Sequence, residues 1–227
     1  MNTEIATSVL AFQTVLRLPA FHKGDNRASY PPMARAVTLT RTTSETDISL
    51  TLDLDGVGAA TAATGIGFLD HMLTAFARHG LLDLSIRATG DLHIDPHHTT
   101  EDVGIVLGQA VARAIGDKRG IRRFGHAVIP MDEALVEAAI DMSGRGLLAW
   151  SVAFPTERVG AMEWELFEEF FRAFATNALL TLHVTARAGR NTHHIAEACF
   201  KSVARALRAA VESDPRVIDV PSTKGAL

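Results

Sequence analysis

The sequence reads His97-His98-Thr99-Thr100-Glu101 in its first half and His193-His194-Ile195-Ala196-Glu197 in its second half. Both stretches have the pattern His-His-x-x-Glu, and they lie 96 residues apart. Leu84-Ser85-Ile86 and Leu180-Thr181-Leu182 precede them with the same separation. A pattern that recurs together with its flanking apolar segment indicates an internal duplication. We therefore expect a fold built of two related halves.

The correspondence continues on the N-terminal side of each pattern, but its separation changes along the chain. At a separation of 88, three residues of the first half match three of the second: Arg35, Asp53 and Gly56 match Arg123, Asp141 and Gly144. The segment 68–78 matches 166–176 at a separation of 98. Extra residues of the second half fall between Gly144 and Trp164, where the run 147–154 predicts a strand that ends at Pro155.

Each half has the periodicities of both strands and helices. Alternating apolar residues over 48–54 predict a strand with one buried face, and 82–88 predicts another. Apolar residues at helical spacing predict helices over 68–80 and 101–115. The order strand, strand, helix, strand, helix indicates an α+β sandwich, with helices on one face of each sheet. We predict repeats at 35–120 and 121–227 that form one domain, after a flexible extension at 1–34.

The composition excludes several classes of protein. The chain is 47% hydrophobic and 21% charged, which fits a globular protein with a buried core. Its 22 basic and 26 acidic residues give a net charge of −4, without the basic excess that nucleic-acid binding requires. The single cysteine, Cys199, cannot form an intrachain disulfide, and no apolar stretch approaches the roughly 20 residues of a membrane span. We expect a cytoplasmic protein that binds neither nucleic acid nor membranes.

Histidine and glutamate at these spacings are typical of a metal site, and exposed polar residues alone do not explain two such clusters at equivalent positions. On a helix, residues three and four apart lie on neighbouring turns, so Glu101 can meet His98 or His97. Adjacent helix residues diverge by about 100°, which favours two different ions. Imidazole and carboxylate without thiolate suit Mn, Fe or Zn, and Cys199 is expected in the core. The 98-residue separation adds His71 and Glu169 as candidate ligands.

Other charged residues are further candidates, each with an ordinary structural alternative. The segment 118–125 is basic and contains two glycines, which suits a phosphate, although such segments are more often only solvated. Lys201 follows Glu197 by one helical turn and is either a substrate contact or an ordinary Glu–Lys helix pair. Glu45 and Asp132-Glu133 stand at equivalent places in the two halves, as proton carriers or as solvated strand ends.

Several motifs resemble, in order along the chain, those of the imidazoleglycerol-phosphate dehydratase family. They are Phe68-Leu69-Asp70-His71-Met72-Leu73, Gly90-Asp91, His97-His98-Thr99-x-Glu101-Asp102, Arg123-Phe124-Gly125, Asp132-Glu133-Ala134-Leu135 and Pro221-Ser222-x-Lys224-Gly225. The resemblance covers the chain from about Arg35 to its end. It implies a duplicated sandwich like domain 2 of ribosomal protein S5. It also implies a hydro-lyase of histidine biosynthesis that converts imidazole glycerol phosphate into imidazole acetol phosphate.

The resemblance further implies two manganese ions per active site, other divalent cations being possible, which bind the substrate as its imidazolate. The implied metal ligands are His71, His97, His98, Glu101, Glu169, His193, His194 and Glu197. The implied phosphate contacts are Arg123, Arg145, Lys201, Ser222 and Lys224. Glu45 and Asp132 fall at substrate-contacting acids, which implies proton transfer or hydroxyl orientation. Ala75 replaces a polar residue of some relatives, so one substrate contact is expected to be lost or replaced.

Assembly and alternative functions complete the expectations. The resemblance implies a homo-oligomer of 24 subunits with active sites shared between subunits, and a C-terminal tail carrying Ser222 and Lys224 suits contact with a neighbour. A metal-dependent phosphate-ester hydrolase would use the same metals and basic residues, and a metal-storage protein would use the histidines alone. No fused histidinol-phosphate phosphatase is expected, because residues 1–34 are too few for such a domain.

Overall fold

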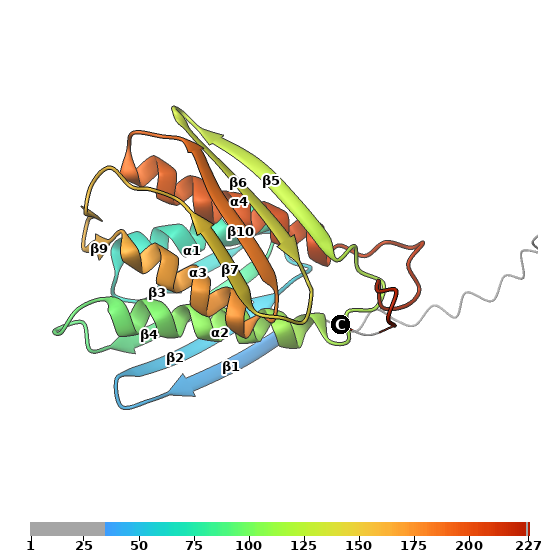
Figure 1. Cartoon of the computed structure of the whole chain (residues 1–227). Coiled ribbons are helices and arrows are strands. Elements are labelled where there is room, and N and C mark those ends of the chain that lie inside the picture. Colours follow the sequence, from blue (N-terminus) through green and yellow to red (C-terminus); the bar gives the residue numbers. More distant parts are fainter. Residues whose placement is uncertain (1–34, 226) are drawn as a thin grey trace, which may run out of the picture. The chain divides into compact units, whose positions relative to one another are not determined.

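The computed structural model of the chain describes residues 35–225 and Leu227, and the predicted extension 1–34 lies outside them. The first half forms a mixed sheet in the order β1-β2-β4-β3 (Figure 1). Its strands are β1 (Ala36–Thr42), β2 (Thr46–Asp53), β3 (Ala60–Ala63) and β4 (Asp83–Gly90). The first three strands in the sheet are antiparallel, and β3 is parallel to β4. The helices α1 (Gly67–Gly80) and α2 (His97–Ile115) complete this half.

The second half repeats this arrangement, which bears out the predicted duplication. Its sheet has the order β5-β6-β10-β7, with β10 antiparallel to β6 and parallel to β7. Its strands and helices are β5 (Phe124–Met131), β6 (Ala134–Asp141), β7 (Leu147–Ser151), β10 (Thr181–Ala188), α3 (Glu165–Asn177) and α4 (Thr192–Val211). A small hairpin of β8 (Arg158–Val159) and β9 (Met162–Glu163) lies between β7 and α3 in the chain and lengthens this half.

Two predicted elements differ from the observed ones. The order predicted for the first half lacks β3, because the sequence 60–63 contains few of the β-branched and aromatic residues that mark strands. The strand observed in place of the predicted strand 147–154 is shorter, because β7 ends at Ser151. Its pairing with β10 stops at Thr185, immediately before the register of β10 shifts.

Strand pairing also corrects the alignment of the two halves. Asp83 pairs with Asp53 in the first sheet. Thr181 pairs with Asp141 in the second sheet. Because Asp53 and Asp141 are equivalent, Asp83 corresponds to Thr181 at a separation of 98, and the predicted match of residues 84–86 at a separation of 96 is wrong. Both separations are even and strand side chains alternate with a period of two, so the apolar pattern fits either equally well.

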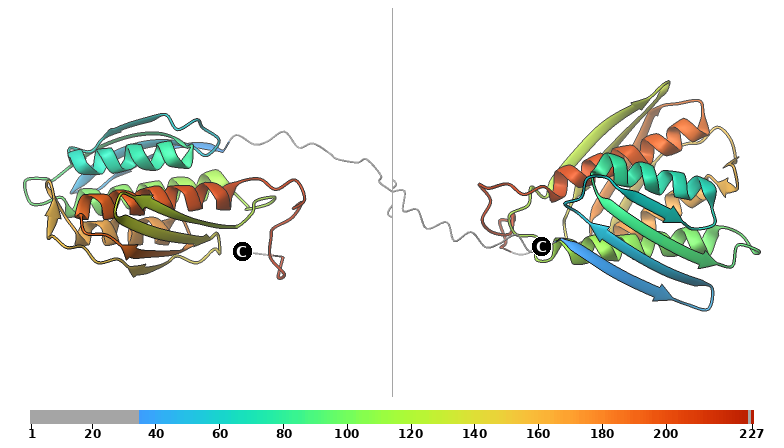
Figure 2. Two further views of the ribbon diagram at one scale, coloured as in Figure 1. Left: turned by 90° about the horizontal axis from the view of Figure 1, so that it is seen from above. Right: turned by 180° about the vertical axis from the view of Figure 1, so that it is seen from behind.

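The two sheets form the outer layers of residues 35–227, and the four helices lie between them (Figure 2). Helix α1 packs against α4, and α2 packs against α3. The inward-facing residues of both sheets and the apolar faces of the helices form one continuous core, in which Cys199 is buried as expected. The α+β sandwich with helices on one face of each sheet is therefore confirmed.

Helices α2 and α3 approach each other closely at two glycines. A Cβ atom on Gly104 would lie 2.6 Å from the carbonyl oxygen of Phe170. A Cβ atom on Gly108 would lie 2.5 Å from the carbonyl oxygen of Phe174. Any larger residue would therefore force the two helix backbones apart.

Candidate metal and substrate site

Both His-His-x-x-Glu stretches begin a helix, as predicted. The side chain of Asn191 accepts a hydrogen bond from the backbone N–H of His193 at 2.9 Å. Asp95, at the equivalent position of the first half, accepts one from the backbone N–H of His97 at 2.7 Å. These bonds satisfy amide groups that have no partner within the helix. They fix where each helix starts and place the histidines in its first turn.

One compact cluster joins α1 and α4, and we call His71, His193 and Glu197 the α1/α4 cluster. The Nε2 atoms of His71 and His193 lie 3.3 Å and 3.1 Å from Oε2 of Glu197. One ligand atom from each of the three residues lies within 4.8 Å of the other two. The ring of Phe68 packs edge-on against the His193 ring, with 5.0 Å between the centroids. The packing of α1 on α4 therefore brings together donors that are 126 residues apart in the sequence.

The charge of Glu197 is held in place by Lys201. Its Oε1 accepts a hydrogen bond from Lys201 Nζ at 2.7 Å, and only 10% of the Glu197 side chain is exposed. Burial acts to raise the pKa of Glu197, but the hydrogen bond and charge of Lys201, with the hydrogen bonds from His193 and His71, lower it. The carboxylate is therefore ionised at neutral pH. Lys201 therefore forms a Glu–Lys pair along the helix, which is the ordinary structural role considered for it above. This pair lies beside the candidate metal ligands.

The chemistry of the α1/α4 cluster fits a divalent transition-metal ion. Two imidazole nitrogens face the same oxygen of an ionised carboxylate. Mixed nitrogen and oxygen donors without thiolate suit Mn, Fe or Zn. The thiol of Cys199 is fully buried in the core and does not belong to this group of donors.

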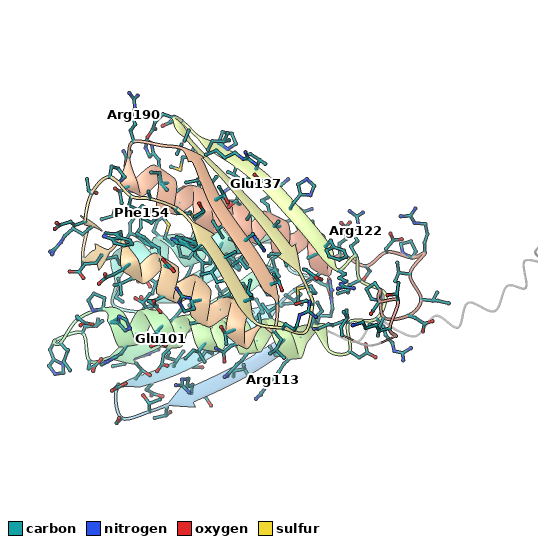
Figure 3. The ribbon with its side chains drawn as sticks, in the orientation of Figure 1. Glu101, Arg113, Arg122, Glu137, Phe154 and Arg190 are labelled. Atoms are coloured by element: carbon teal, nitrogen blue, oxygen red, sulfur yellow. The ribbon has the colours of Figure 1, made fainter. Side chains whose placement is uncertain are left out.

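The equivalent residues on α2 and α3 do not converge on one carboxylate, and the glutamate Glu101 is more exposed than Glu197; we call His97, Glu101 and Glu169 the α2/α3 cluster. His97 Nε2 lies 3.9 Å from Glu101 Oε2, and almost half of each side chain is exposed. Figure 3 shows Glu101 on α2. Glu169 lies 3.6 Å from Arg172 Nε, one turn along its own helix. Among residues 35–225 and Leu227, the α1/α4 cluster is the one group of three such donors whose ligand atoms all lie within 4.8 Å of one another.

The adjacent histidines diverge, as predicted from the helical rotation. In each pair the two rings are 6.1 Å apart with an interplanar angle of 84°. His98 Nδ1 lies 2.9 Å from Asp91 Oδ2, and His194 Nδ1 lies 2.8 Å from Glu133 Oε2. The hydrogen bond to Asp91 raises the pKa of His98 above its ordinary value. Hydrogen bonds from His194 and from the backbone N–H of Arg190 lower the pKa of Glu133 to about 2.

The acids predicted to contact substrate lie beside these second histidines. Glu45 Oε2 is 4.0 Å from His98 Nδ1, and half of its side chain is exposed. Asp132 Oδ2 is 3.9 Å from His194 Nε2, and 81% of its side chain is exposed. Sequence reasoning assigned no role to Asp91 and chose Asp132 over Glu133. The sequence does contain a signal for both residues, since each half has a carboxylate in a loop that precedes or faces the helix carrying its histidine pair.

The predicted phosphate contacts do not form one group. Arg123 binds both oxygens of Asp141, at 2.7 Å and 3.1 Å, and donates to the carbonyl oxygen of Pro221 at 2.9 Å. Arg145 donates to the carbonyl oxygen of Ser143 at 3.4 Å. Ser222 Oγ accepts from the backbone N–H of Lys224 at 3.2 Å. Arg123 thus holds the C-terminal tail near the start of β5.

Lys201 lies away from Arg123. Its Nζ is 3.7 Å from the sulfur of Met131, at the end of β5, whereas Arg123 directly precedes the start of the same strand. The backbone N–H of Arg123 donates to the carbonyl oxygen of Ala210. Lys201 and Ala210 are nine positions apart on α4, which corresponds to a rise of about 13.5 Å. Within one chain, Lys201 and Arg123 therefore do not contact the same phosphate.

Comparison with known proteins gives consistent matches. The family described as imidazoleglycerol-phosphate dehydratase matches residues 64–207. The chain is 74% identical over 196 residues to the imidazoleglycerol-phosphate dehydratase of Granulibacter bethesdensis, covering 86% of this chain and 100% of that protein. It is 67% identical over 195 residues to the enzyme of that name in Gluconacetobacter diazotrophicus, covering 86% and 98%.

Solved structures agree with these matches. The crystal structure of imidazoleglycerol-phosphate dehydratase from Staphylococcus aureus has a TM-score of 0.72 and 42% identity, covering 79% of this chain and 99% of that chain. The structure of the enzyme from Pyrococcus furiosus has a TM-score of 0.73 and 38% identity, covering 83% and 100%. In the part of the chain that the structure describes, no helix has the length and apolar character needed to cross a membrane.

Proposed function

The chain belongs to the imidazoleglycerol-phosphate dehydratase family of hydro-lyases in histidine biosynthesis, and we propose that its histidine clusters hold the divalent cations of the reaction. The observation that carries the proposal is the convergence of two imidazole nitrogens on one oxygen of Glu197, at 3.3 Å and 3.1 Å. The proposed ligands are His71, His97, His98, Glu101, Glu169, His193, His194 and Glu197. Manganese is our choice of metal, and other divalent ions suit the same donors.

The chemistry of the substrate explains why the site needs positive charge. In the product the ketone lies on the second carbon from the imidazole ring, so that carbon is the one that loses its proton. It adjoins neither a carbonyl group nor the ring, and an unaided base therefore faces a very weak carbon acid. Divalent cations held by the proposed ligands would supply positive charge that stabilises the imidazole ring in its deprotonated form, whose electrons help to expel hydroxide. Hydroxide leaves from the carbon bonded to the ring, the proton leaves from the next carbon, and together they form the water that is lost. The resulting enol then becomes the ketone.

Glu45 and Asp132 are the proposed groups that move protons or orient the substrate hydroxyl. Each lies about 4 Å from a ring nitrogen of one histidine pair, and each side chain is at least half exposed. An exposed carboxylate keeps its freedom to reach a bound molecule, which an ion-paired one lacks. The arrangement supports two acids on opposite halves of the fold.

We propose that the active site is completed by a second copy of the chain. The α2/α3 cluster is open, and His98 and His194 face acids outside both clusters. Lys201 and Arg123 lie too far apart to hold one phosphate within one chain. A homo-oligomer with active sites shared between subunits resolves both observations. It would place Lys201 of one copy near four residues of another copy: Arg123, Arg145, Ser222 and Lys224. We place this assembly in the cytoplasm, where a reduced cysteine such as Cys199 is expected.

The test is the metal dependence of dehydration. Metal-stripped protein is incubated with imidazole glycerol phosphate, with and without Mn²⁺, and the products are followed by mass spectrometry. We expect loss of one water only with the metal. His71→Ala should lose this activity and His183→Ala should keep it, because His183 lies exposed on β10. Release of inorganic phosphate instead would support the hydrolase, and metal binding without any reaction would support storage.

A further inference from the structure

The second histidine of each pair has its own carboxylate partner. Asp91 Oδ2 lies 2.9 Å from His98 Nδ1, and Glu133 Oε2 lies 2.8 Å from His194 Nδ1. The two histidines occupy equivalent positions, but their partners do not. Asp91 lies in the loop between β4 and α2, whereas Glu133 lies in the turn between β5 and β6. The same contact is therefore made twice from different places in the chain.

Each contact fixes which nitrogen of the neutral imidazole ring carries the proton. An ionised carboxylate accepts hydrogen bonds and cannot donate one, so Nδ1 of each histidine must carry the proton. Nε2 then keeps its lone pair and is the nitrogen able to bind a metal. The hydrogen bond also holds the orientation of the ring.

Glu133 is held more firmly than Asp91. Glu133 Oε1 accepts hydrogen bonds from the backbone N–H groups of Arg190 and Asn191, at 3.0 Å and 2.8 Å. Its second oxygen is thereby aimed at His194. Asp91 Oδ1 is buried without a hydrogen-bond partner among the described residues, so one histidine is the main partner of the Asp91 carboxylate.

We propose that Asp91 and Glu133 are positioning residues, which hold His98 and His194 with Nε2 free to bind the metal. This inference rests on the proposed function, because it assigns a role toward the same cations. It also separates the acids of the site into two classes. Asp91 and Glu133 are committed to histidines, which leaves Glu45 and Asp132 free to contact the substrate.

The equivalence of the two halves supports this separation. Glu45 and Glu133 occupy equivalent turns, at a separation of 88. Glu133 contacts His194 Nδ1 at 2.8 Å. Glu45 is 4.0 Å from His98 Nδ1, because Asp91 already contacts that nitrogen at 2.9 Å. In the first half Asp91 has therefore replaced Glu45 in orienting the histidine.

Two amide substitutions test the proposal by opposite predictions. In Glu133→Gln the two backbone N–H groups require the amide oxygen, so the amide NH₂ faces His194 Nδ1 and forces the ring proton onto Nε2. In Asp91→Asn no second bond fixes the amide, and its oxygen can still accept from His98 Nδ1. We expect Glu133→Gln to lower the affinity for Mn²⁺ about 10- to 100-fold, the range typical of lost outer-shell partners. Asp91→Asn should lower it several-fold less.

Mn²⁺ binding is measured directly, by electron paramagnetic resonance of the free ion, with melting temperature as the check on folding. Asp95→Asn is the matched control, because it removes one negative charge from the same loop as Asp91 and keeps its hydrogen bond to the His97 backbone. Its affinity should stay within about twofold of the wild type. Wild-type affinity in Glu133→Gln, or equal losses in all three variants, would overturn the positioning role. A wild-type chain without Mn²⁺ binding would instead overturn the proposed function.

Discussion

The α1/α4 and α2/α3 clusters occupy equivalent positions of a duplicated fold, yet only the first is compact. In the α1/α4 cluster the donor atoms lie within 4.8 Å of one another. In the α2/α3 cluster His97 and Glu101 are 3.9 Å apart and Glu169 is paired with Arg172. Helix spacing does not explain the difference, because glycines already bring α2 and α3 into close backbone contact.

Charge explains the difference. The α1/α4 cluster has two imidazoles and one carboxylate, and Lys201 balances that carboxylate at 2.7 Å. The α2/α3 cluster has two carboxylates, because Glu169 replaces the histidine, and Ile105 stands at the position equivalent to Lys201. Without a cation, like charges favour separation and solvent exposure. The two halves therefore share their backbone positions, and the side chains determine which of the two clusters is compact.

The largest expected effect concerns the helix contact that carries the open cluster. Gly108→Ala places a methyl group 2.5 Å from the carbonyl oxygen of Phe174 and 2.9 Å from the backbone nitrogen of Ala178. We expect a loss of about 2 to 3 kcal/mol in the free energy of unfolding, because backbone atoms must move. Ala204→Gly at the equivalent position of α4 should cost only about 1 kcal/mol through lower helix propensity. Urea denaturation of metal-free protein measures both, and a Gly108→Ala variant as stable as the wild type would contradict the close contact.

The next effect distinguishes the two glutamates in metal-free protein. Glu197→Gln leaves Lys201 without a charged partner, and these side chains are only 10% and 19% exposed. We expect a loss of about 2 kcal/mol, or about 4 to 8 °C in melting temperature. Glu101→Gln should change stability by less than about 0.5 kcal/mol, since its side chain is nearly half exposed. Equal melting temperatures for the two variants would refute a preformed α1/α4 cluster.

The sequence was sufficient to predict the duplication, the four helices and the histidine clusters, because these depend on local spacing. It could not predict that Asp91 and Glu133 both bind histidines, since the two acids are not at equivalent positions. The separation of Lys201 from Arg123 was also beyond reach, because it depends on how β5 crosses α4. The alignment of β4 with β10 failed for a further reason: a shift of two residues leaves every strand side chain on the same face.

The smallest effect compares how the two halves anchor the loop before their third strand. Asp83 accepts hydrogen bonds from the backbone N–H groups of Ala59 and Val57, and these lower its pKa below the ordinary value of 3.8. At the equivalent position, Thr181 uses a neutral hydroxyl, 2.9 Å from Ser143 Oγ. Because the pKa of Asp83 is lower in the folded state, its contribution to stability is present above the unfolded-state pKa and is lost as the pH falls through the lower folded-state pKa.

Melting temperatures measured from pH 6 to pH 3 test this comparison. The difference between wild type and Asp83→Asn should shrink toward zero at the acidic end, since protonation removes the charge that the substitution removes. Thr181→Val should lower stability by about 1 kcal/mol at every pH, because a hydroxyl does not titrate in this range. A pH-independent difference for Asp83→Asn would mean that the hydrogen-bond geometry, and not the charge, anchors the loop of the first half. The two halves would then use the same kind of anchor for this loop.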